Sequence, residues 1–344
     1  NIRSIAFARA SKNKDANDGG IKVAFGTEFA LRCARQNSGG TVVTAAGSFH
    51  NIPFVSETLV VAVPELISDT IRARYDPGPS ARGIVSAGGD IVIRPSPDQM
   101  GLFAYAAMGV ISSTQLNSAY RHVSVPTQTR FGSAIGIVPF TLLKYPGVGT
   151  SDMQFTDSCL NRLAVEIVAG QYLRATANWM CRISSLTAQS SGSFVEAAEY
   201  TWNQVSLSLG GVALTDWEAL TITIDNGLEF VPTLDGTTVN RLLLQNAFRQ
   251  INIAGTADLP DLDEWNTFRA GSLTTLDVTI EGTSISSGNV ETLRFIVPAF
   301  RYNAFPISAP GPTRTTVGFE GRAVYHQGSA LAMQITVQNT RASY

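Results

Sequence analysis

The sequence predicts an all-β protein with minor α content, built from tandem β-sandwich or half-barrel units that each carry one short flanking helix. Two observations support this class. Nearly every patterned segment alternates apolar and polar residues with a period of two, which is typical of a strand that buries one face. In addition, a unit of strand, long excursion, strand and helix occurs twice, about once in each half of the chain.

The clearest copy of this unit lies in the second half of the chain. In its first strand, which starts at Trp217, apolar residues alternate with Thr221, Thr223 and Asp225. The second strand, Arg249–Gly255, repeats the alternation after a long excursion. One buried and one solvated face are therefore expected for both strands.

A short amphipathic helix is expected over Asp261–Arg269. Pro260 precedes it, and its first turn is rich in acidic residues, as is favourable at a helix N-terminus. Its apolar residues fall on one side of the helix: Leu262, Trp265 and Phe268.

The earlier copy of the unit comprises a strand over Ser56–Val63, a second strand over Asp90–Arg94 and a helix over Pro97–Met108. The spacings of the two copies agree. From Glu57 to Ile91 is 34 positions (91 − 57), and from Glu218 to Ile251 is 33 (251 − 218). The chain is therefore expected to be duplicated, although any all-β chain can offer two such strand pairs by chance.

The excursions inside the two units, Tyr75–Gly83 and Val231–Val239, are dense in turn-forming residues and predict no regular structure. Plain hairpins need only two to five residues, so excursions of this length at equivalent places indicate functional loops. Ordinary surface loops are the alternative.

Further strands precede, separate and follow these units. They are expected over Phe25–Arg35, Thr41–Ala45, Ala134–Tyr145, Leu163–Val168, Tyr172–Ile183, Gln204–Gly211, Leu273–Glu281, Thr292–Pro298, Arg322–His326 and Ala332–Gln338.

A chain of 344 residues usually forms more than one domain, and the polar segment 187–193 suits a hinge. The predicted organisation is an N-terminal arm over residues 1–22, a first β domain over residues 23–186 and a second β domain over residues 187–344. The arm is polar and suits a segment that orders against a partner.

The composition excludes several classes of protein. Charged residues make up only 15% of the chain and the net charge is −2, which argues against tight binding of nucleic acid through clustered Lys and Arg. Cys33, Cys159 and Cys181 show no metal-binding spacing and are expected to be reduced and buried. No apolar run long enough for a membrane span and no signal peptide is evident, so a soluble protein made in the cytoplasm is expected.

No catalytic, metal or cofactor site is indicated. The three histidines, His50, His122 and His326, are scattered and share no motif with the cysteines or with a nucleophilic serine. An acidic cluster occurs near residue 260, but it lacks the glycine and terminal glutamate of a calcium loop. An enzyme is therefore not expected.

Several motifs together point to a family. Ser86-Ala-Gly-Gly-Asp-Ile-Val-Ile is followed by Phe103-Ala-Tyr-Ala-Ala-Met-Gly, and the second half contains Leu220-Thr-Ile-Thr-Ile-Asp-Asn-Gly-Leu and Phe295-Ile-Val-Pro-Ala-Phe. In these motifs and their order, the chain resembles the major tail tube proteins of long-tailed, siphovirus-type bacteriophages. The resemblance covers about residues 20 to 340.

This resemblance implies a structural virion protein of the tail, made in the cytoplasm of a host bacterium. Such proteins stack as rings into a hollow tube that delivers double-stranded DNA, with loops and arms reaching the next ring. A ring usually holds six tube domains, so three copies with two domains each are expected, and six copies with one tube domain and one decoration are the alternative. Implied partners are further copies of the chain and the tape measure, terminator and distal tail proteins.

The same resemblance, with the strand alternation, suggests which residues face the tube lumen. The candidates are Glu57, Glu218, Thr221, Thr223 and Asp225.

Other functions remain open from the sequence. The inner tube of a contractile tail or another injection system shares the expected fold. A phage decoration or receptor-binding β-sandwich is also compatible, and would stay a discrete oligomer. A secreted carbohydrate-active enzyme is disfavoured because neither a signal peptide nor paired carboxylates are evident.

Overall fold

The computed structural model describes residues 24–129, 137–190, 194–195, 197–286, 288–308, 311 and 314–344. The arm expected at residues 1–22 lies outside the described residues. The described chain consists mainly of strands, with two α-helices and three short 3-10 helices. The expected class, all-β with minor α, is confirmed.

The elements of the first half are β1 (Ala30–Arg35), β2 (His50–Ile52), β3 (Ser56–Glu57), β4 (Val60–Ala62), β5 (Glu65–Ile67), β6 (Ser80–Arg82), β7 (Ser86–Ile93), α1 (Pro97–Met108), β8 (Gly109–Leu116), β9 (Ala119–Pro126), β10 (Phe140–Tyr145), β11 (Ser151–Val168) and β12 (Arg174–Ala188). The elements of the second half are β13 (Val205–Leu209), β14 (Val212–Leu214), β15 (Trp217–Asp225), β16 (Leu228–Val231), β17 (Leu242–Gln245), β18 (Gln250–Asp258), α2 (Asp263–Ala270), β19 (Thr274–Ser286), β20 (Asn289–Ala304), β21 (Thr316–Ala323) and β22 (Gln334–Asn339). The 3-10 helices span Gly26–Glu28, Ala46–Ser48 and Trp202–Gln204.

The two halves build sheets of the same strand order. In the first half the order is β2–β1–β10–β11–β12–β7, and β3 with β4 takes the last position. In the second half it is β14–β13–β19–β20–β21–β18–β15. All these pairs are antiparallel. A hairpin (β5–β6 or β16–β17) precedes β7 or β18, and α1 or α2 follows it, so the topology of the chain is duplicated.

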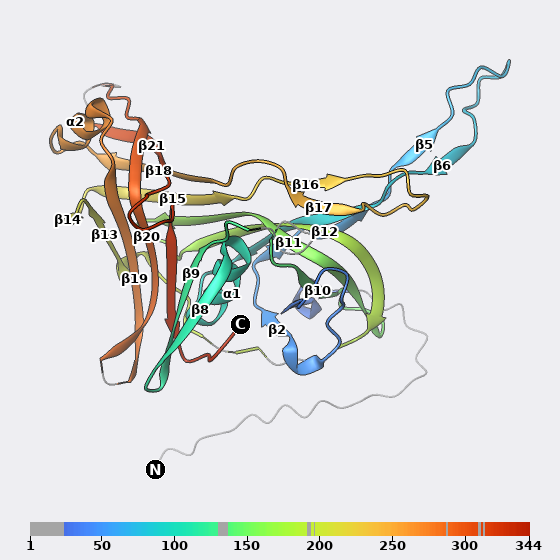
Figure 1. Ribbon diagram of the computed structural model, residues 1–344, viewed down its shortest axis with the longest axis horizontal. Coiled ribbons are helices and arrows are strands. Elements are labelled where there is room, and N and C mark those ends of the chain that lie inside the picture. Colours follow the sequence, from blue (N-terminus) through green and yellow to red (C-terminus); the bar gives the residue numbers. More distant parts are fainter. Residues whose placement is uncertain are drawn as a thin grey trace, which may run out of the picture.

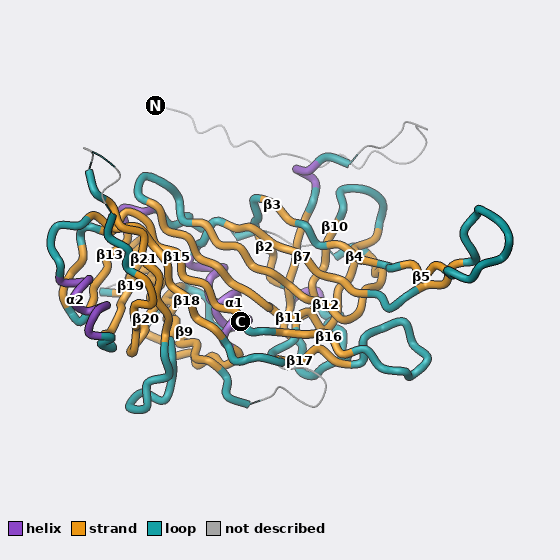
Figure 2. Tube along the Cα trace, turned by 90° about the horizontal axis from the view of Figure 1, so that it is seen from above, coloured by secondary structure: helices purple, strands orange, loops and turns teal. Residues whose placement is uncertain are grey.

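Two connections join the halves into one continuous sheet. The C-terminal part of β11 pairs with β15, and the last strand, β22, pairs with both β20 and β9. The hairpin β8–β9, inserted between α1 and β10, has no counterpart in the second half. Figure 1 shows the two groups of strands enclosing α1, and Figure 2 shows the same strands from above. The expected division of the chain at residues 186 and 187 stays a prediction.

The helix α1 is the centre of the core. Every residue of α1 except Asp98 is buried, and α1 packs against β8, β9, β11, β20 and β22. It starts at Pro97, where a missing N–H costs nothing, and ends at Gly109, whose left-handed backbone (φ +88°) lets its N–H bond to the carbonyl of Tyr105. Because α1 is apolar on all sides, it requires cover from both halves. Phe103 of α1 accordingly shares one cluster with Leu220 and Phe295.

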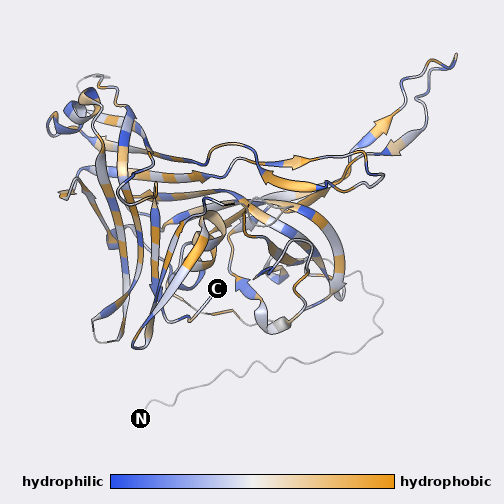
Figure 3. Ribbon diagram, in the orientation of Figure 1, coloured by the Kyte–Doolittle hydropathy of each residue, from blue (hydrophilic) through white to orange (hydrophobic). Residues whose placement is uncertain are grey.

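The second helix is shorter and peripheral. It begins at Asp263, two residues later than expected. Trp265 and Phe268 pack against the core as expected, whereas Leu262 precedes the helix and is half-exposed. Away from the helices, the alternation of apolar and polar residues along the long strands is visible in Figure 3.

Two glycines mark the same position of the duplicated unit. A Cβ on Gly89 of β7 would lie 2.3 Å from the carbonyl oxygen of Thr58, and a Cβ on Gly255 of β18 would lie 2.4 Å from that of Ala219. Each glycine therefore lets its strand approach the first strand of the unit closely. The Ala-Gly-Gly-Asp motif noted in the sequence has this packing function.

Two details of the sequence interpretation are corrected. Residues 41–45, expected as a strand, form no regular structure, although the N–H of Val43 donates to the hydroxyl of Thr141 in β10 at 3.3 Å. The excursion Tyr75–Gly83, expected to be irregular, ends in strand β6, because residues Ser80–Arg82 pair with β5.

We expect Gly255→Ala to lower the free energy of unfolding by about 1–3 kcal/mol, because the added methyl group overlaps the carbonyl of Ala219 and forces β15 and β18 apart. Urea unfolding of the unassembled protein, followed by tryptophan fluorescence, measures this change. The matched control is Gly318→Ala on the adjacent strand β21, where a Cβ meets nothing within 4 Å. Equal stability of the two variants would contradict the proposed role of Gly255.

Candidate assembly surface

Strand β15 presents two chemically different faces. Leu220, Ile222 and Ile224 are at most 2% exposed and belong to the core cluster that contains α1. Thr221, Thr223 and Asp225 lie on the other face and are partly exposed. The alternation expected from the sequence is therefore present, and it gives the sheet a polar face directed away from α1.

This polar face continues across the neighbouring strands, because residues directly opposite each other in antiparallel strands share a face. Thr221 lies opposite Glu166 of β11 and Ala254 of β18, and Ala254 lies opposite Glu320 of β21. Asp225 lies opposite Arg162 of β11. The face thus spans at least β12, β11, β15, β18 and β21.

The charges on the polar face are mixed. We define it by five arginines and six carboxylates, a sum of 5 − 6 = −1: Arg162, Arg174, Arg301, Arg314, Arg322, Asp90, Glu166, Glu218, Asp225, Asp258 and Glu320. A face with interspersed signs and a small net charge produces only a weak long-range field.

Glu218 reaches the polar face through an irregularity in β15. The pairing register shifts between Trp217 and Ala219, so Glu218 is the additional residue of a β-bulge. Its carboxylate pairs with Arg314, whose Nε lies 3.1 Å from Oδ1 of Asp258 on the polar face. Without the bulge, Glu218 would share the parity of the buried Leu220.

Glu57 does not lie on the polar face, which corrects the expectation for this residue. It is opposite the buried Ile91 and therefore points to the core side of the sheet. Its side chain is 8% exposed, with Oε1 2.6 Å from Nζ of Lys144 and Oε2 accepting the N–H of Leu59 at 2.8 Å. The sequence contains no local signal for this ion pair, since Lys144 is on the distant strand β10.

The Ile-Asp-Asn-Gly motif ends β15 and ties it to the core. The side chain of Asp225 accepts the N–H of Gly227, and Gly227 adopts the left-handed conformation (φ +57°). The buried Asn226 donates to the carbonyls of Ala107 at 3.1 Å and Leu160 at 2.9 Å. Its amide thus joins the end of α1 to β11.

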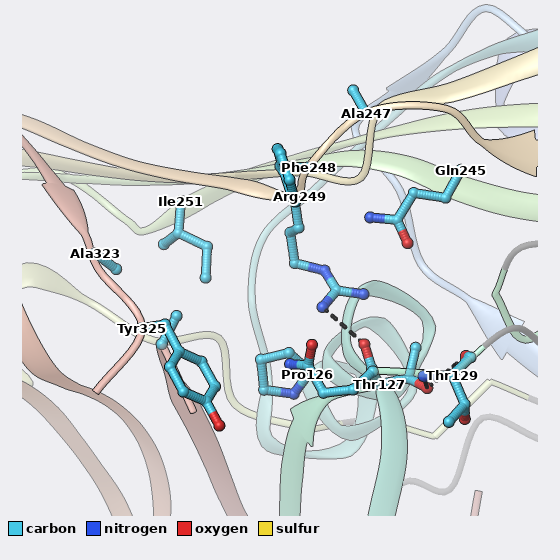
Figure 4. A pocket seen from close by; sticks show the side chains of 12 residues that line it. Pro126, Thr127, Thr129, Gln245, Ala247, Phe248, Arg249, Ile251, Ala323 and Tyr325 are labelled. Atoms are coloured by element: carbon cyan, nitrogen blue, oxygen red, sulfur yellow. Dashed lines mark hydrogen bonds between the residues drawn. The ribbon is translucent and has the colours of Figure 1, made fainter. Parts of the chain in front are cut away.

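Arg249 completes this network and lines a neighbouring pocket of about 420 Å³ (Figure 4). Its Nε donates to the Oδ1 of Asn226 at 2.7 Å, and its Nη1 donates to the carbonyl of Thr127 at 3.2 Å. Burial lowers the pKa of Arg249 to about 10, so the guanidinium stays charged at neutral pH. Phe248 and Tyr325 add apolar walls, and the arrangement suits a structural role or the binding of an anionic group.

The hairpin β5–β6 projects from the body, whereas β16–β17 packs on it, with Leu228 and Leu243 in a buried cluster with Cys159. All residues of β5 and β6 are exposed, and Figure 1 shows this hairpin extending far from the sheets. Its loop carries Ile71 and Tyr75, which are almost fully exposed. The loop between β16 and β17 contacts the base of the β5–β6 hairpin, where the N–H of Val85 donates to the carbonyl of Thr238 at 2.8 Å. An isolated hairpin with exposed apolar residues is only marginally stable without a partner.

The three thiols and the imidazole of His122 are engaged in packing. Cys33, Cys159 and Cys181 are free and fully buried, and burial raises the pKa of each. His122 accepts a hydrogen bond from the hydroxyl of Ser113 at 2.7 Å and donates through Nε2 to the carbonyl of Arg341 at 2.8 Å, because a carbonyl can only accept. Burial lowers the pKa of His122, so it stays neutral near pH 7.

The contact between His122 and Arg341 was not foreseen in the sequence, since Arg341 lies 219 residues after His122. It holds the C-terminal segment against β9. Within the part of the chain that is described, no group of three or more His, Cys, Asp or Glu is placed to hold a metal ion. In the same residues, no helix has the length and apolarity that crossing a membrane requires.

Replacing Asn226 by Ala should lower the free energy of unfolding by about 1–3 kcal/mol, because buried carbonyls of Ala107 and Leu160 lose their donor and Arg249 loses its acceptor. Thermal and urea unfolding of the unassembled chain measure the effect. Asn252→Ala, on the exposed face of β18, is the matched control and should change stability by no more than about 0.5 kcal/mol. A similar loss in both variants would show that the network does not stabilise the core.

Comparison with known proteins agrees with this architecture. No protein of curated function matches the chain. A family model described as phage tail tube protein matches residues 26–321, which is well over half of the chain. The duplicated β topology, with one helix and one hairpin in each copy, thus occurs in a chain that belongs to the phage tail tube protein family, a family of structural components of bacteriophage tails.

Proposed function

We propose that the chain polymerises as stacked rings that form the hollow tail tube of a long-tailed phage, through which double-stranded DNA is delivered to the host. The family match over residues 26–321 is the observation that carries this proposal. The role is structural and involves no catalytic step. The protein would be made in the cytoplasm of the host bacterium and would end in the virion tail.

The duplicated topology supports a ring made of three copies. Each half supplies one sheet of the same strand order, and the two sheets are already joined inside the chain by β11 and β15. If each half acts as one tube domain, over residues 23–186 and 187–344, three copies give the six domains of a ring. Neighbouring tail components, the tape measure, terminator and distal tail proteins, would contact the ends or the lumen of the tube.

The polar face is our candidate for the lumen, with Glu218, Thr221, Thr223 and Asp225 among its lining residues. Glu57 is excluded because it lies in a buried ion pair. Mixed charges with a sum of −1 would let DNA pass without release of many counterions, whereas a basic lining would bind the phosphates. Short side chains such as those of Thr221 and Thr223 would not protrude from such a lining into the path of the DNA.

Negative-stain microscopy of the concentrated, purified protein tests the proposal. Hollow filaments are expected, and end-on projections with six similar lobes together with a ring mass of three chains would support the stoichiometry. A protein that stays a compact monomer at all concentrations, with native folding verified by circular dichroism, would refute the proposed function.

The hairpin β5–β6 suggests a prediction for stacking. Ile71→Asp combined with Tyr75→Asp should shorten or abolish tubes while leaving single rings, because the hairpin would lose the apolar surface that contacts the next ring. The melting temperature of the unassembled variant should be unchanged, since both side chains are exposed. Filament length measured by microscopy is the readout.

Asp76→Ser, on the same loop, is the control for this pair of substitutions. It changes a neighbouring charge without removing apolar surface, and it should leave tube length unchanged. Tubes of normal length in the double variant would mean that the hairpin tip does not contribute to stacking.

A further inference from the structure

We propose that a second copy of the chain binds the outer edge of the strand formed by β3 and β4, and that it does so with the segment Pro306–Ser308, which follows β20. This inference rests on the proposed function, because it identifies the strands that would close a ring. It extends to a second molecule the joint that the chain already makes between its own halves.

The joint inside the chain pairs the end of β11 with β15. Residues 162–168 of β11 lie antiparallel to residues 219–225 of β15. In the duplicated topology, β20 takes the position of β11, and β3 with β4 takes the position of β15. Repeating the joint once more therefore brings the residues after β20 against β3 and β4 of another copy.

Residues of β12 can be matched with residues of β21, and this match shows which residues after β20 correspond to residues of β11. Trp179 of β12 lies opposite Gly89, and Phe319 of β21 lies opposite Gly255, the equivalent glycine. Trp179 and Phe319 are each 1% exposed. A residue of β12 thus corresponds to the residue of β21 that is 140 positions later (319 − 179).

This equivalence identifies the residues of the new joint. Arg162 pairs with Asn178 of β12, whose counterpart in β21 is Gly318. Continuing the Ala304–Glu320 pairing by two residues places Pro306 opposite Gly318. Pro306 therefore corresponds to Arg162, and two residues further on Ser308 corresponds to Ala164.

The close contacts of Gly89 and Gly255 show which residues of β3 and β4 correspond to residues of β15. Gly89 approaches the carbonyl of Thr58, and Gly255 approaches that of Ala219, so these two carbonyl positions correspond. Four residues further on, Ala62 corresponds to Thr223. In the joint inside the chain Ala164 lies opposite Thr223, so Ser308 of one copy should lie opposite Ala62 of the next.

Exposure of apolar residues at the proposed joint supports this pairing. Leu163 and Ile224, which are opposite each other in the joint inside the chain, are each 1% exposed. Their counterparts Ile307 and Val63 are 40% and 52% exposed in the single chain. Pairing with a second copy would bury these two side chains as the first joint buries theirs.

The outer edge of β3 and β4 has the features of a strand that pairs with another chain. Within the described residues, β3 and β4 pair only with β7, so their outer edge is uncovered, whereas β15 is paired on both sides. Exposed Val55 and Val60 flank this edge. An uncovered edge with apolar neighbours is prone to pairing with another chain, and a specific partner removes that hazard. Pro306 would stand at the start of the added strand, where sheets tolerate proline.

Site-directed disulfide formation tests the pairing in full-length protein assembled into tubes. Opposite residues of an antiparallel pair have Cα atoms about 4.5–5.5 Å apart, which suits a disulfide. In the variant Ala62→Cys/Ser308→Cys, oxidation of tubes should convert monomers into covalent oligomers on non-reducing gels. The three native cysteines are fully buried and free, so they should not compete.

Two further cysteine pairs serve as controls. Ala164→Cys/Thr223→Cys reproduces the joint inside the chain and should link only within one molecule. Val60→Cys/Ser308→Cys is displaced by two residues, about 6–7 Å along the strand, and should remain monomeric. If the first variant folds poorly, Val63→Cys/Ile307→Cys probes the same register at a neighbouring pair.

The outcomes separate the two proposals. Covalent oligomers from the 62/308 or 63/307 pair, with a monomeric off-register control, support the joint. Tubes that form normally but yield no link at either pair, or yield it equally off register, overturn the joint and leave the tube function intact. Protein that folds but forms no tubes at any concentration overturns the tube function and the joint with it.

Discussion

The fold depends on the backbone pairing of β11 with β15. Each half of the chain produces a sheet with seven strand positions. The last position is taken by β3 with β4 in the first half and by β15 in the second half. In the second half that end is closed because residues 219–225 pair with β11. This pairing makes one sheet from two, and it allows both halves to cover α1, in which every residue except Asp98 is buried.

Much of this architecture could be predicted from sequence because it follows from local patterns. Alternating residues identified most strands, including both strands of each repeated unit, and turn residues located the excursions. Proline and an apolar run were sufficient to place α1. The duplication is also a local signal, since it repeats spacings of 34 and 33 residues between strands.

The rest depended on contacts between distant residues. Glu57 carries a charge, and alternation alone cannot show that Lys144 from β10 neutralises it on the core side of the sheet. Glu218 reaches the polar face only because of a bulge, which has no signature in β15 itself. The insertion of β8–β9 and its pairing with β22 join residues more than 200 positions apart, beyond the reach of any periodic pattern.

The β11–β15 connection has a kinetic consequence for oligomers built from this chain. Partners held on one polypeptide meet at a high effective concentration and lose little translational freedom when they join. In a closed ring of three such chains, every second junction would be complete before any two molecules collide. Fusion of the units would thus halve the number of junctions that must form between separate molecules, and it would leave each unit free to acquire its own insertions, as the β8–β9 hairpin illustrates.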